Sequence, residues 1–349
     1  MNVKTRLSLR NVSFAYDCFF TSKISHQPHC PVLTDGNVVV DGSSKHMTHL
    51  PESLSLPGKQ GTVSPRILRL LNDDLRRIEP SPNPYEGTAL YYDDSPIPVF
   101  IVVPRNVARN RLKLHERNFH KKLSHASRKL CRLESFSPRG KGRWVIFDKN
   151  KCPNSPVDNG YVCLGPKVLR GAPGVSTYSN HAKVAPIEHD LCQTLAARME
   201  HLTREFIPSD DLHTVEHAHN VARWPRFKAV RDKSKECKMY AGFNVSSGSY
   251  HNVHLDDDFG YSTVVLFDPD NEGQEEEAIV RYFCFPRLGV AIGLRVGDVI
   301  IFNAREWHCS SSMAVDRQIF SFGGYIKTAH VGGNDNKSSL TELQSNIDT

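Results

Sequence analysis

Six short runs of strand-forming residues between positions 239 and 326 constrain the fold of this chain more than any other feature. The runs cover residues 239–245, 262–267, 279–285, 290–294, 298–302 and 318–326, and Gly, Asn and Asp residues separate them. Parallel strands need crossover connections of about a dozen residues or more, whereas closely spaced strands can pair antiparallel through short turns. The sequence therefore predicts a mainly β or α+β fold with an antiparallel sandwich or jelly roll, in place of a parallel α/β sheet.

The rest of the chain divides into regions of different character. Residues 1–95 mix Ser, Gly, Pro, Lys and His without sustained apolar periodicity, which predicts a loosely ordered N-terminal region. Residues 96–151 contain a buried-strand pattern followed by a basic segment. We expect one folded domain over residues 152–330 and a frayed polar tail over 331–349.

One helix can be predicted with clear bounds. Between Ile187 and Phe206, apolar side chains recur three or four residues apart, and Pro208 follows. This spacing places them on one stripe of an α-helix, and the proline stops it. The sequence therefore predicts a helix at 187–206 within the folded domain.

Positive charge is concentrated in one part of the chain. The formal net charge is +6, but 15 basic and only 3 acidic residues lie between Arg105 and Lys151, and the rest of the chain contains 29 basic and 35 acidic residues. Leucines interspersed with these charges favour an amphipathic helix with one cationic face. Such a face is typical of a nucleic-acid contact and also of an ordinary solvated surface, and both interpretations stay open here.

His254, Asp256, His308 and Arg317 form an ordered set within the β-rich region. A His-x-Asp triplet at the end of a strand directs two side chains to the same side, so both can reach one metal ion. Two imidazoles and one carboxylate are the ligands that hold a non-haem Fe(II) and leave positions open for O2. An arginine on the next strand can bind a carboxylate co-substrate through two parallel hydrogen bonds. His251 is the nearest competing ligand, but no carboxylate stands two residues after it.

Residues 241–325 resemble the catalytic core of the Fe(II)/2-oxoglutarate-dependent oxygenases. The stretches that carry the resemblance are AGFNVSSGSYHNVHLDDDFGYSTVVLF, GLRVGDVIIFNAREWHCSSS and DRQIFSFGGY. Within that superfamily they are most similar to the branch of the TET 5-methylcytosine oxygenases and the base J thymine hydroxylases, although the chain has no Cys-rich zinc region of the TET type. The resemblance implies a double-stranded β-helix, the jelly roll of the cupins, with the helix at 187–206 on its outer face.

The resemblance also implies roles for individual residues. His254, Asp256 and His308 would bind iron, and Arg317 would bind the C5 carboxylate of 2-oxoglutarate. The implied reaction consumes O2 and 2-oxoglutarate, with ascorbate as a reductant, and hydroxylates a substrate C–H bond while succinate and CO2 are released. The substrate expected on this basis is a methyl group of a modified base or of thymine in nucleic acid, held through the basic segment 105–151.

Three polar residues close to the motifs are expected to face the co-substrate. They are Asn244, Tyr250 and Ser310. Inward-facing polar side chains at such positions often contact co-substrate or substrate in the oxygenase fold. A purely structural role, as hydrogen-bonded strand residues, is the alternative for each of them.

Other functions compete with this interpretation. Residues His213 to His217 match H-x-x-E-H, an inverted zinc-protease pattern, and His219 extends the cluster. The flanking prolines Pro208 and Pro225 leave room only for a short helix, which disfavours that alternative. An oxygenase acting on a protein side chain or a small molecule, and a non-catalytic nucleic-acid-binding protein, are the two further alternatives.

Cysteine usage and targeting signals indicate the compartment. Nine cysteines are scattered without any C-x-x-C pair, which argues against a disulfide framework and against a cysteine-based zinc site. We therefore expect reduced thiols and a nuclear or cytoplasmic location. The basic start of the chain, up to Tyr16, leaves organelle targeting as an alternative. No apolar run approaches the ~18 residues of a membrane span, and the oligomeric state cannot be predicted.

Overall fold

The structure is a computed structural model, and it describes part of the chain. The described residues are 7–13, 38–40, 76–92, 98–133, 145–147, 160–168, 176–178, 184–207, 240, 242–247, 249–251, and 256–327 apart from 257, 259, 271–277, 286–287, 289, 305, 307, 312, 314, 316 and 326. No described helix is long and apolar enough to cross a membrane.

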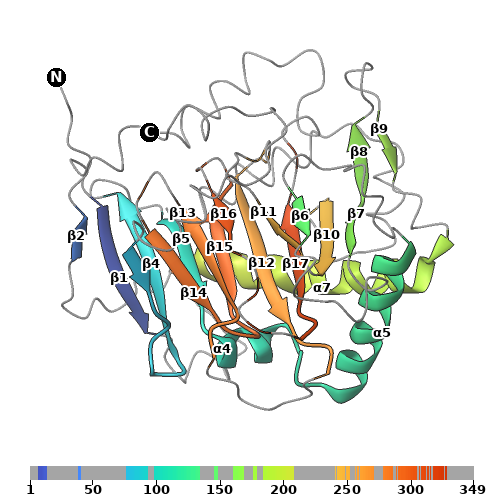
Figure 1. Cartoon of the computed structure of the whole chain (residues 1–349), viewed down its shortest axis with the longest axis horizontal. Helices are drawn as coiled ribbons and strands as arrows, with labels where there is room; N and C mark the ends of the chain where they lie inside the picture. Colours follow the sequence, from blue (N-terminus) through green and yellow to red (C-terminus); the bar gives the residue numbers. More distant parts are fainter. Residues whose placement is uncertain are drawn as a thin grey trace.

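Nine of the described strands form one large sheet (Figure 1). In chain order they are β1 (Leu7–Ser13), β2 (Val38–Val40), β4 (Glu86–Tyr92), β5 (Pro98–Val103), β7 (Gly160–Leu164), β10 (Gly242–Ser247), β12 (Tyr261–Phe267), β15 (Val299–Asn303) and β17 (Phe320–Tyr325). In space they follow the order β2-β1-β4-β5-β15-β12-β17-β10-β7, and all neighbouring strands are antiparallel.

A smaller sheet lies against the large one. Its strands are β3 (Arg76–Ile78), β13 (Arg281–Phe285), β14 (Val290–Leu294) and β16 (Cys309–Ser310), in the order β16-β13-β14-β3. Next to β16 lies β11 (Ser249–His251), which pairs with β6 (Val145–Phe147). A separate hairpin consists of β8 (Pro166–Val168) and β9 (Ser176–Tyr178).

The chain crosses repeatedly between the two sheets. It runs from β10 in the large sheet to β11 beside the small one, back to β12, on to β13 and β14, back to β15, over to β16 and finally to β17. This path is a double-stranded β-helix, so the predicted fold class is confirmed. The sequence pattern also finds the strands themselves, because each predicted run contains or overlaps one of them.

Two apolar layers result from the alternation of side chains along the strands. On β17, Phe320 and Phe322 face the helices, whereas Ser321 between them faces the small sheet. The outer layer packs the large sheet against α4 (Arg105–Arg111), α5 (Arg117–Leu133) and α7 (Pro186–Phe206). The inner layer fills part of the space between the sheets with side chains such as Phe100, Phe285 and Leu294.

The predicted helix at 187–206 is confirmed as α7, with one difference in its apolar stripe. Leu195, Met199 and Leu202 are completely buried, but Ile187 is 79% exposed. Pro186 opens the helix, and in its first turn Glu188 and His189 are buried, whereas Ile187 points to solvent. Pro is favoured at this first position because its missing N–H would have no partner there.

The prediction of a loosely ordered region up to residue 95 is wrong for residues 7–13 and 38–40, which form β1 and β2, and for residues 76–92. Residues 76–92 contain β3 and β4, and β4 lies inside the large sheet between β1 and β5. The pairing with β5 buries Leu90 completely. The pairing of β4 with β1 and of β3 with β14 joins segments that are distant in sequence, so the local sequence pattern of this proline-interrupted segment does not indicate it.

Residues 105–133 of the basic segment belong to the same folded body. The strand β5 directly before them pairs with β15, and their helices α4 and α5 pack against the outer layer. Part of their charge is used in ion pairs with the body, Arg111 with Glu205 at 3.2 Å and Lys129 with Glu188 at 2.6 Å. The burial of one face of α5 and the exposure of Lys121 and Lys122 on the other agree with the predicted amphipathic helix.

Candidate active site

Asp256 and His308 come together at one end of the barrel. The Nε2 atom of His308 lies 3.3 Å from Oδ2 of Asp256, although 52 residues of chain separate them. The Nδ1 atom of His308 lies 2.8 Å from the carbonyl oxygen of Glu306. Because a carbonyl can only accept, Nδ1 carries the proton and the lone pair of neutral His308 is on Nε2. The imidazole therefore presents a metal-binding nitrogen beside a carboxylate, which fits the donor set of an iron site.

The surroundings of His308 fix its ring. Only 3% of His308 is exposed, and its ring stacks on Phe283 at 5.6 Å and meets the edge of Phe302 at 4.9 Å. Burial lowers the pKa of His308, but the hydrogen bond and the negative charge of Asp256 outweigh it, so the pKa lies above its ordinary value. A rigidly held imidazole next to a carboxylate is what a preorganised ligand pair requires.

A lysine that follows β17 contacts the carboxylates of Asp256 and Asp258. Lys327, just after β17, bonds to Asp258 and lies 3.8 Å from Oδ1 of Asp256. Burial and the charge of Asp256 raise the pKa of Asp258 to about 7, against the opposing effect of Lys327. The two aspartates and the lysine therefore form one electrostatic unit at this end of β12 and β17, in which Asp258 is buried and Asp256 and Lys327 are partly exposed.

Several predicted residues lie outside the described part of the chain. His254 is one of them, and the cluster from His213 to His219 is another. Tyr250 lies in β11, but its side chain is not described. Within the described residues no group of three or more metal-binding side chains occurs, so the structure places two of the three predicted ligands together and does not test the third.

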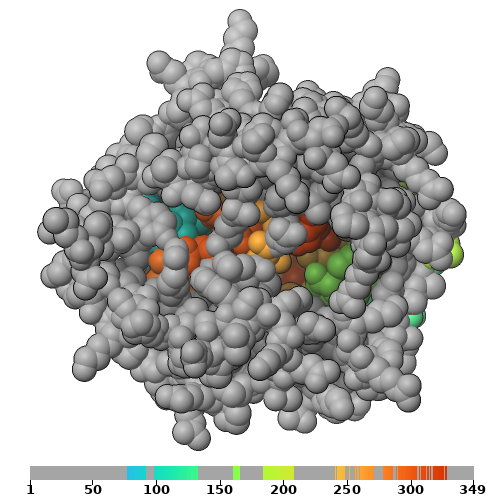
Figure 2. Space-filling view, turned by 90° about the horizontal axis from the view of Figure 1, so that it is seen from above, coloured from blue at the N-terminus to red at the C-terminus, as the bar shows by residue number. Residues whose placement is uncertain are grey.

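Asn244 and Ser310 are linked through Tyr161 and His251, and whether they face a co-substrate stays a prediction. The backbone N–H of His251 donates to Ser310 Oγ at 3.0 Å. The His251 ring meets the ring of Tyr161 edge-on at 5.7 Å, and the Asn244 side-chain amide donates to the Tyr161 hydroxyl at 3.5 Å. Figure 2 looks onto this end of the barrel, where atoms of β7 (green) lie beside the orange and red strands. The four residues therefore form a polar wall between the sheets.

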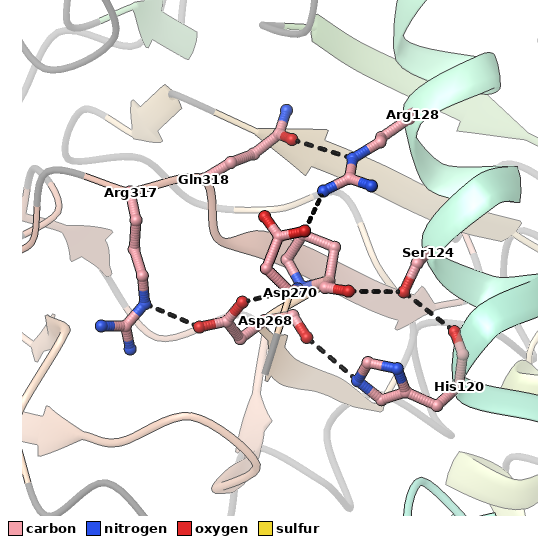
Figure 3. Close-up of polar contacts among 8 residues, drawn as sticks. His120, Ser124, Arg128, Asp268, Asp270, Arg317 and Gln318 are labelled. Carbon is pink, nitrogen blue, oxygen red and sulfur yellow. Dashed lines mark hydrogen bonds and ion pairs between the residues drawn. The ribbon is translucent and has the colours of Figure 1, made fainter. Parts of the chain in front are cut away.

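The structure places Arg317 at the opposite end of the barrel strands. Asp256 and Asp258 precede β12 and Lys327 follows β17, whereas Arg317 precedes β17 and Asp268 follows β12. The Arg317 Nε donates to Asp268 Oδ2 at 2.6 Å (Figure 3). Since β12 has seven residues, about 20 Å of strand separates the two ends. Arg317 is thus not brought together with Asp256 and His308.

Further hydrogen bonds join this far end of the barrel to α5. The His120 ring bonds to the Asp268 carbonyl at 3.1 Å, and Ser124 Oγ donates to the carbonyl of Pro269 at 3.0 Å. Arg128 donates to Asp270 at 2.6 Å and lies beside Gln318 (Figure 3). The basic helix therefore contacts the end of the barrel that is remote from Asp256.

Sequence patterns do not identify three polar residues of this region. Tyr161 lies in β7, Arg281 opens β13 and Lys327 follows β17. None stands in a motif, and only the pairing of distant strands brings them between the sheets. A single Tyr or Arg at a strand position carries no signal that separates it from an ordinary strand residue.

Comparisons with known proteins give likenesses in structure only, since no protein-family model matches the chain and no curated protein matches it significantly. NgTET1 in complex with 5mC DNA is similar at a TM-score of 0.46 and 10% identity, over 81% of this chain and 98% of that one. A prolyl-4-hydroxylase of Pseudomonas putida is similar at 0.33 and 13%, over 60% and 86%. A 2OG-Fe(II) oxygenase family oxidoreductase from Burkholderia pseudomallei is similar at 0.29 and 13%, over 53% and 76%. The order of the strands is the evidence for the fold. This fold is similar to that of the 2OG-Fe(II) oxygenases.

Proposed function

We propose that this chain is an Fe(II)- and 2-oxoglutarate-dependent oxygenase that hydroxylates a C–H bond. One observation carries the proposal. His308 presents Nε2 to the Asp256 carboxylate at the end of a double-stranded β-helix, with its tautomer set by the Glu306 carbonyl. In the sequence, His254 stands two residues before Asp256, and we propose it as the third iron ligand.

The chain's own residues would do three things for this chemistry. Asp256 and His308, with His254, would hold the iron, which when bound supplies the activation of O2. Phe283 and Phe302 exclude water from the His308 ring and keep it oriented. The polar wall of Tyr161, Asn244, His251 and Ser310 offers hydroxyl, amide and imidazole groups that can orient a co-substrate or a substrate beside the metal.

For the substrate, we propose a methyl group on a base in nucleic acid, on the strength of the sequence resemblance to the TET and base J branch. The exposed face of α5, with Lys121 and Lys122, offers phosphates a basic surface. Because α5 contacts the far end of the barrel, it would bind the backbone at a distance from the reacting base. Oxidation of a protein side chain or a small molecule is the alternative, for which this face would be an ordinary solvated surface.

Purified protein supplied with Fe(II), 2-oxoglutarate, O2 and ascorbate is expected to release succinate, and methylated DNA is expected to increase the rate. The same incubation is analysed by mass spectrometry of the nucleosides. Oxidised methyl groups support the nucleic-acid substrate, whereas succinate release with unchanged nucleosides rejects that substrate and leaves the oxygenase. Absence of succinate under all these conditions rejects the oxygenase itself.

The basic face makes a separate prediction. Lys121→Gln combined with Lys122→Gln is expected to weaken binding to duplex DNA and to reduce the slope of log affinity against log salt by about 1 per lysine. Succinate release without nucleic acid is expected to stay unchanged, because both side chains lie on α5, away from Asp256. Fluorescence anisotropy at several salt concentrations measures the slope. An unchanged slope would show that Lys121 and Lys122 make no phosphate contact.

A further inference from the structure

A second carboxylate lies close to the proposed iron ligand Asp256. Asp258 is 2% exposed, and its Oδ2 accepts a hydrogen bond from Ser262 Oγ at 2.9 Å. Ser262 alternates on β12 with Tyr261 and Thr263, which both point to the outer layer, so Ser262 points into the barrel. The Asp258 carboxylate therefore lies on the interior side of the sheet, where a metal ligand is needed.

Lys327 holds this second carboxylate. Its Nζ atom bonds to Asp258, and the two residues form an antiparallel backbone bridge, which places their side chains on the same side. The Tyr325 ring faces the ammonium, with Nζ 4.9 Å from the ring centroid. The Lys327 ammonium is therefore fixed by an ion pair, a backbone pairing and an aromatic ring.

An irregularity in the strand pairing brings the lysine to this position. Thr263 pairs with Gly324 in the regular ladder of β12 and β17, and beyond it Asp258 pairs with Lys327. The chain before β12 therefore uses five residues where the chain after β17 uses three. Gly260 lies on the longer side with a φ of 73°, a left-handed conformation that favours glycine. Such a bulge re-aims side chains, and here it brings Asp258 opposite the lysine.

The same ammonium also contacts Asp256, on the oxygen that does not face His308. Nζ of Lys327 lies 3.8 Å from Oδ1 of Asp256, whereas Oδ2 lies 3.3 Å from Nε2 of His308. Within the part of the chain that the structure describes, Asp258 does not join these two residues in a group of three metal-binding side chains. Asp256 thus presents one oxygen to His308, while Asp258 is held by the lysine.

We propose that Lys327 is a positioning residue of the iron site, which binds Asp258 and thereby keeps this carboxylate out of the metal's ligand set. The inference rests on the proposed function, because it requires a metal ion beside His308. A metal that must bind O2 and a co-substrate needs open positions, and a second carboxylate would fill one of them. Lys327 also offsets one of two negative charges that would repel an anionic co-substrate.

The test measures metal selectivity, because carboxylate oxygens suit Mn(II), whereas imidazole suits the later metals of the series. Affinities of the metal-free full chain for Co(II) and Mn(II) are measured by equilibrium dialysis. Wild-type protein is expected to prefer Co(II), in line with the general order of divalent-metal affinities. Lys327→Met frees Asp258 for the metal, so the affinity for Mn(II) is expected to rise and the preference for Co(II) to fall on the order of tenfold.

Two substitutions at Asp258 complete the test. Lys327→Met combined with Asp258→Asn removes the competing carboxylate, and it is expected to return the preference to within about twofold of the wild-type value. Asp258→Asn alone is expected to change both affinities by the same factor, because Asp258 is not a ligand in the wild type. This single variant keeps the inference testable should Lys327→Met, which leaves a buried carboxylate without this cation, not fold.

The outcomes separate this inference from the proposed function. An unchanged preference in folded Lys327→Met overturns the inference and leaves the oxygenase in place, as does a fall that the second substitution fails to reverse. A preference for Co(II) that rises in Asp258→Asn alone also overturns it, because Asp258 would then be a ligand in the wild type. Wild-type protein that binds neither metal overturns the inference together with the proposed function. A fall in Lys327→Met that Asp258→Asn reverses supports the inference.

Discussion

Replacing His308 with alanine is expected to lower the affinity for Fe(II) by 100-fold or more and to abolish succinate release. His308 supplies the one described imidazole nitrogen that faces Asp256, and its ring is held by Phe283 and Phe302. Loss of residues that merely support a metal ligand costs 10–100-fold in affinity, so loss of the ligand itself is expected to cost at least as much. Equilibrium Fe(II) binding under anaerobic conditions measures the first effect, and succinate release measures the second.

A second histidine provides the matched control. His201 is exposed on α7, which packs on the outer face of the large sheet, so His201→Ala is expected to leave both measurements unchanged. If His308→Ala binds Fe(II) as tightly as the control, His308 is not a ligand. The proposed iron site would then lack the histidine ligand whose position the structure describes.

The largest expected effect on stability is that of Asp298→Ala. Asp298 is completely buried, and its carboxylate accepts hydrogen bonds from the backbone N–H of Arg105 at 2.8 Å and of Arg295 at 2.8 Å. It also pairs with the Arg295 guanidinium at 3.3 Å, which is itself 4% exposed. Removing the carboxylate leaves a buried cation and the first N–H of α4 without this acceptor, so the free energy of unfolding is expected to fall by about 3–5 kcal/mol. Urea-induced unfolding measures it.

Asp270→Ala is the control for this substitution. Asp270 also pairs with an arginine, Arg128 at 2.6 Å, but its side chain is 68% exposed. An exposed ion pair contributes about 0–1 kcal/mol, so its loss is expected to change the unfolding free energy by no more than that. Equal effects of the two substitutions would show that Asp298 does not anchor α4 and the β14–β15 turn as described.

Local patterns in the sequence were sufficient to predict the C-terminal fold. Short runs of strand-forming residues separated by Gly, Asn and Asp indicated the antiparallel strands, and steps of three and four residues indicated α7. The strands β3 and β4 escaped prediction because β3 pairs with β14 and β4 pairs with β1, which are distant in sequence, although β4 also pairs with the nearby β5. Pairing between distant segments depends on the whole fold, and a local pattern does not encode it.

The candidate site was predictable only where its residues stand in a motif. Asp256 and His308 are close in space as their order in the sequence implies, because the first follows β11 and the second precedes β16. Arg317 was predicted to bind the co-substrate carboxylate from its position shortly after His308. That spacing does not determine in which direction a side chain points before β17 begins at Phe320. The structure directs its side chain to Asp268, and it places Arg281, which no motif marks, in the barrel interior.

The measurement that tests the central claim most directly is a titration of metal-free protein with Fe(II), followed by succinate release at saturating 2-oxoglutarate and O2. The proposed function predicts a rate that rises linearly up to one Fe(II) per chain and then stays constant, and that is absent when Zn(II) replaces Fe(II). Succinate release that is absent at every Fe(II) level, or that is equal with Zn(II), would contradict it.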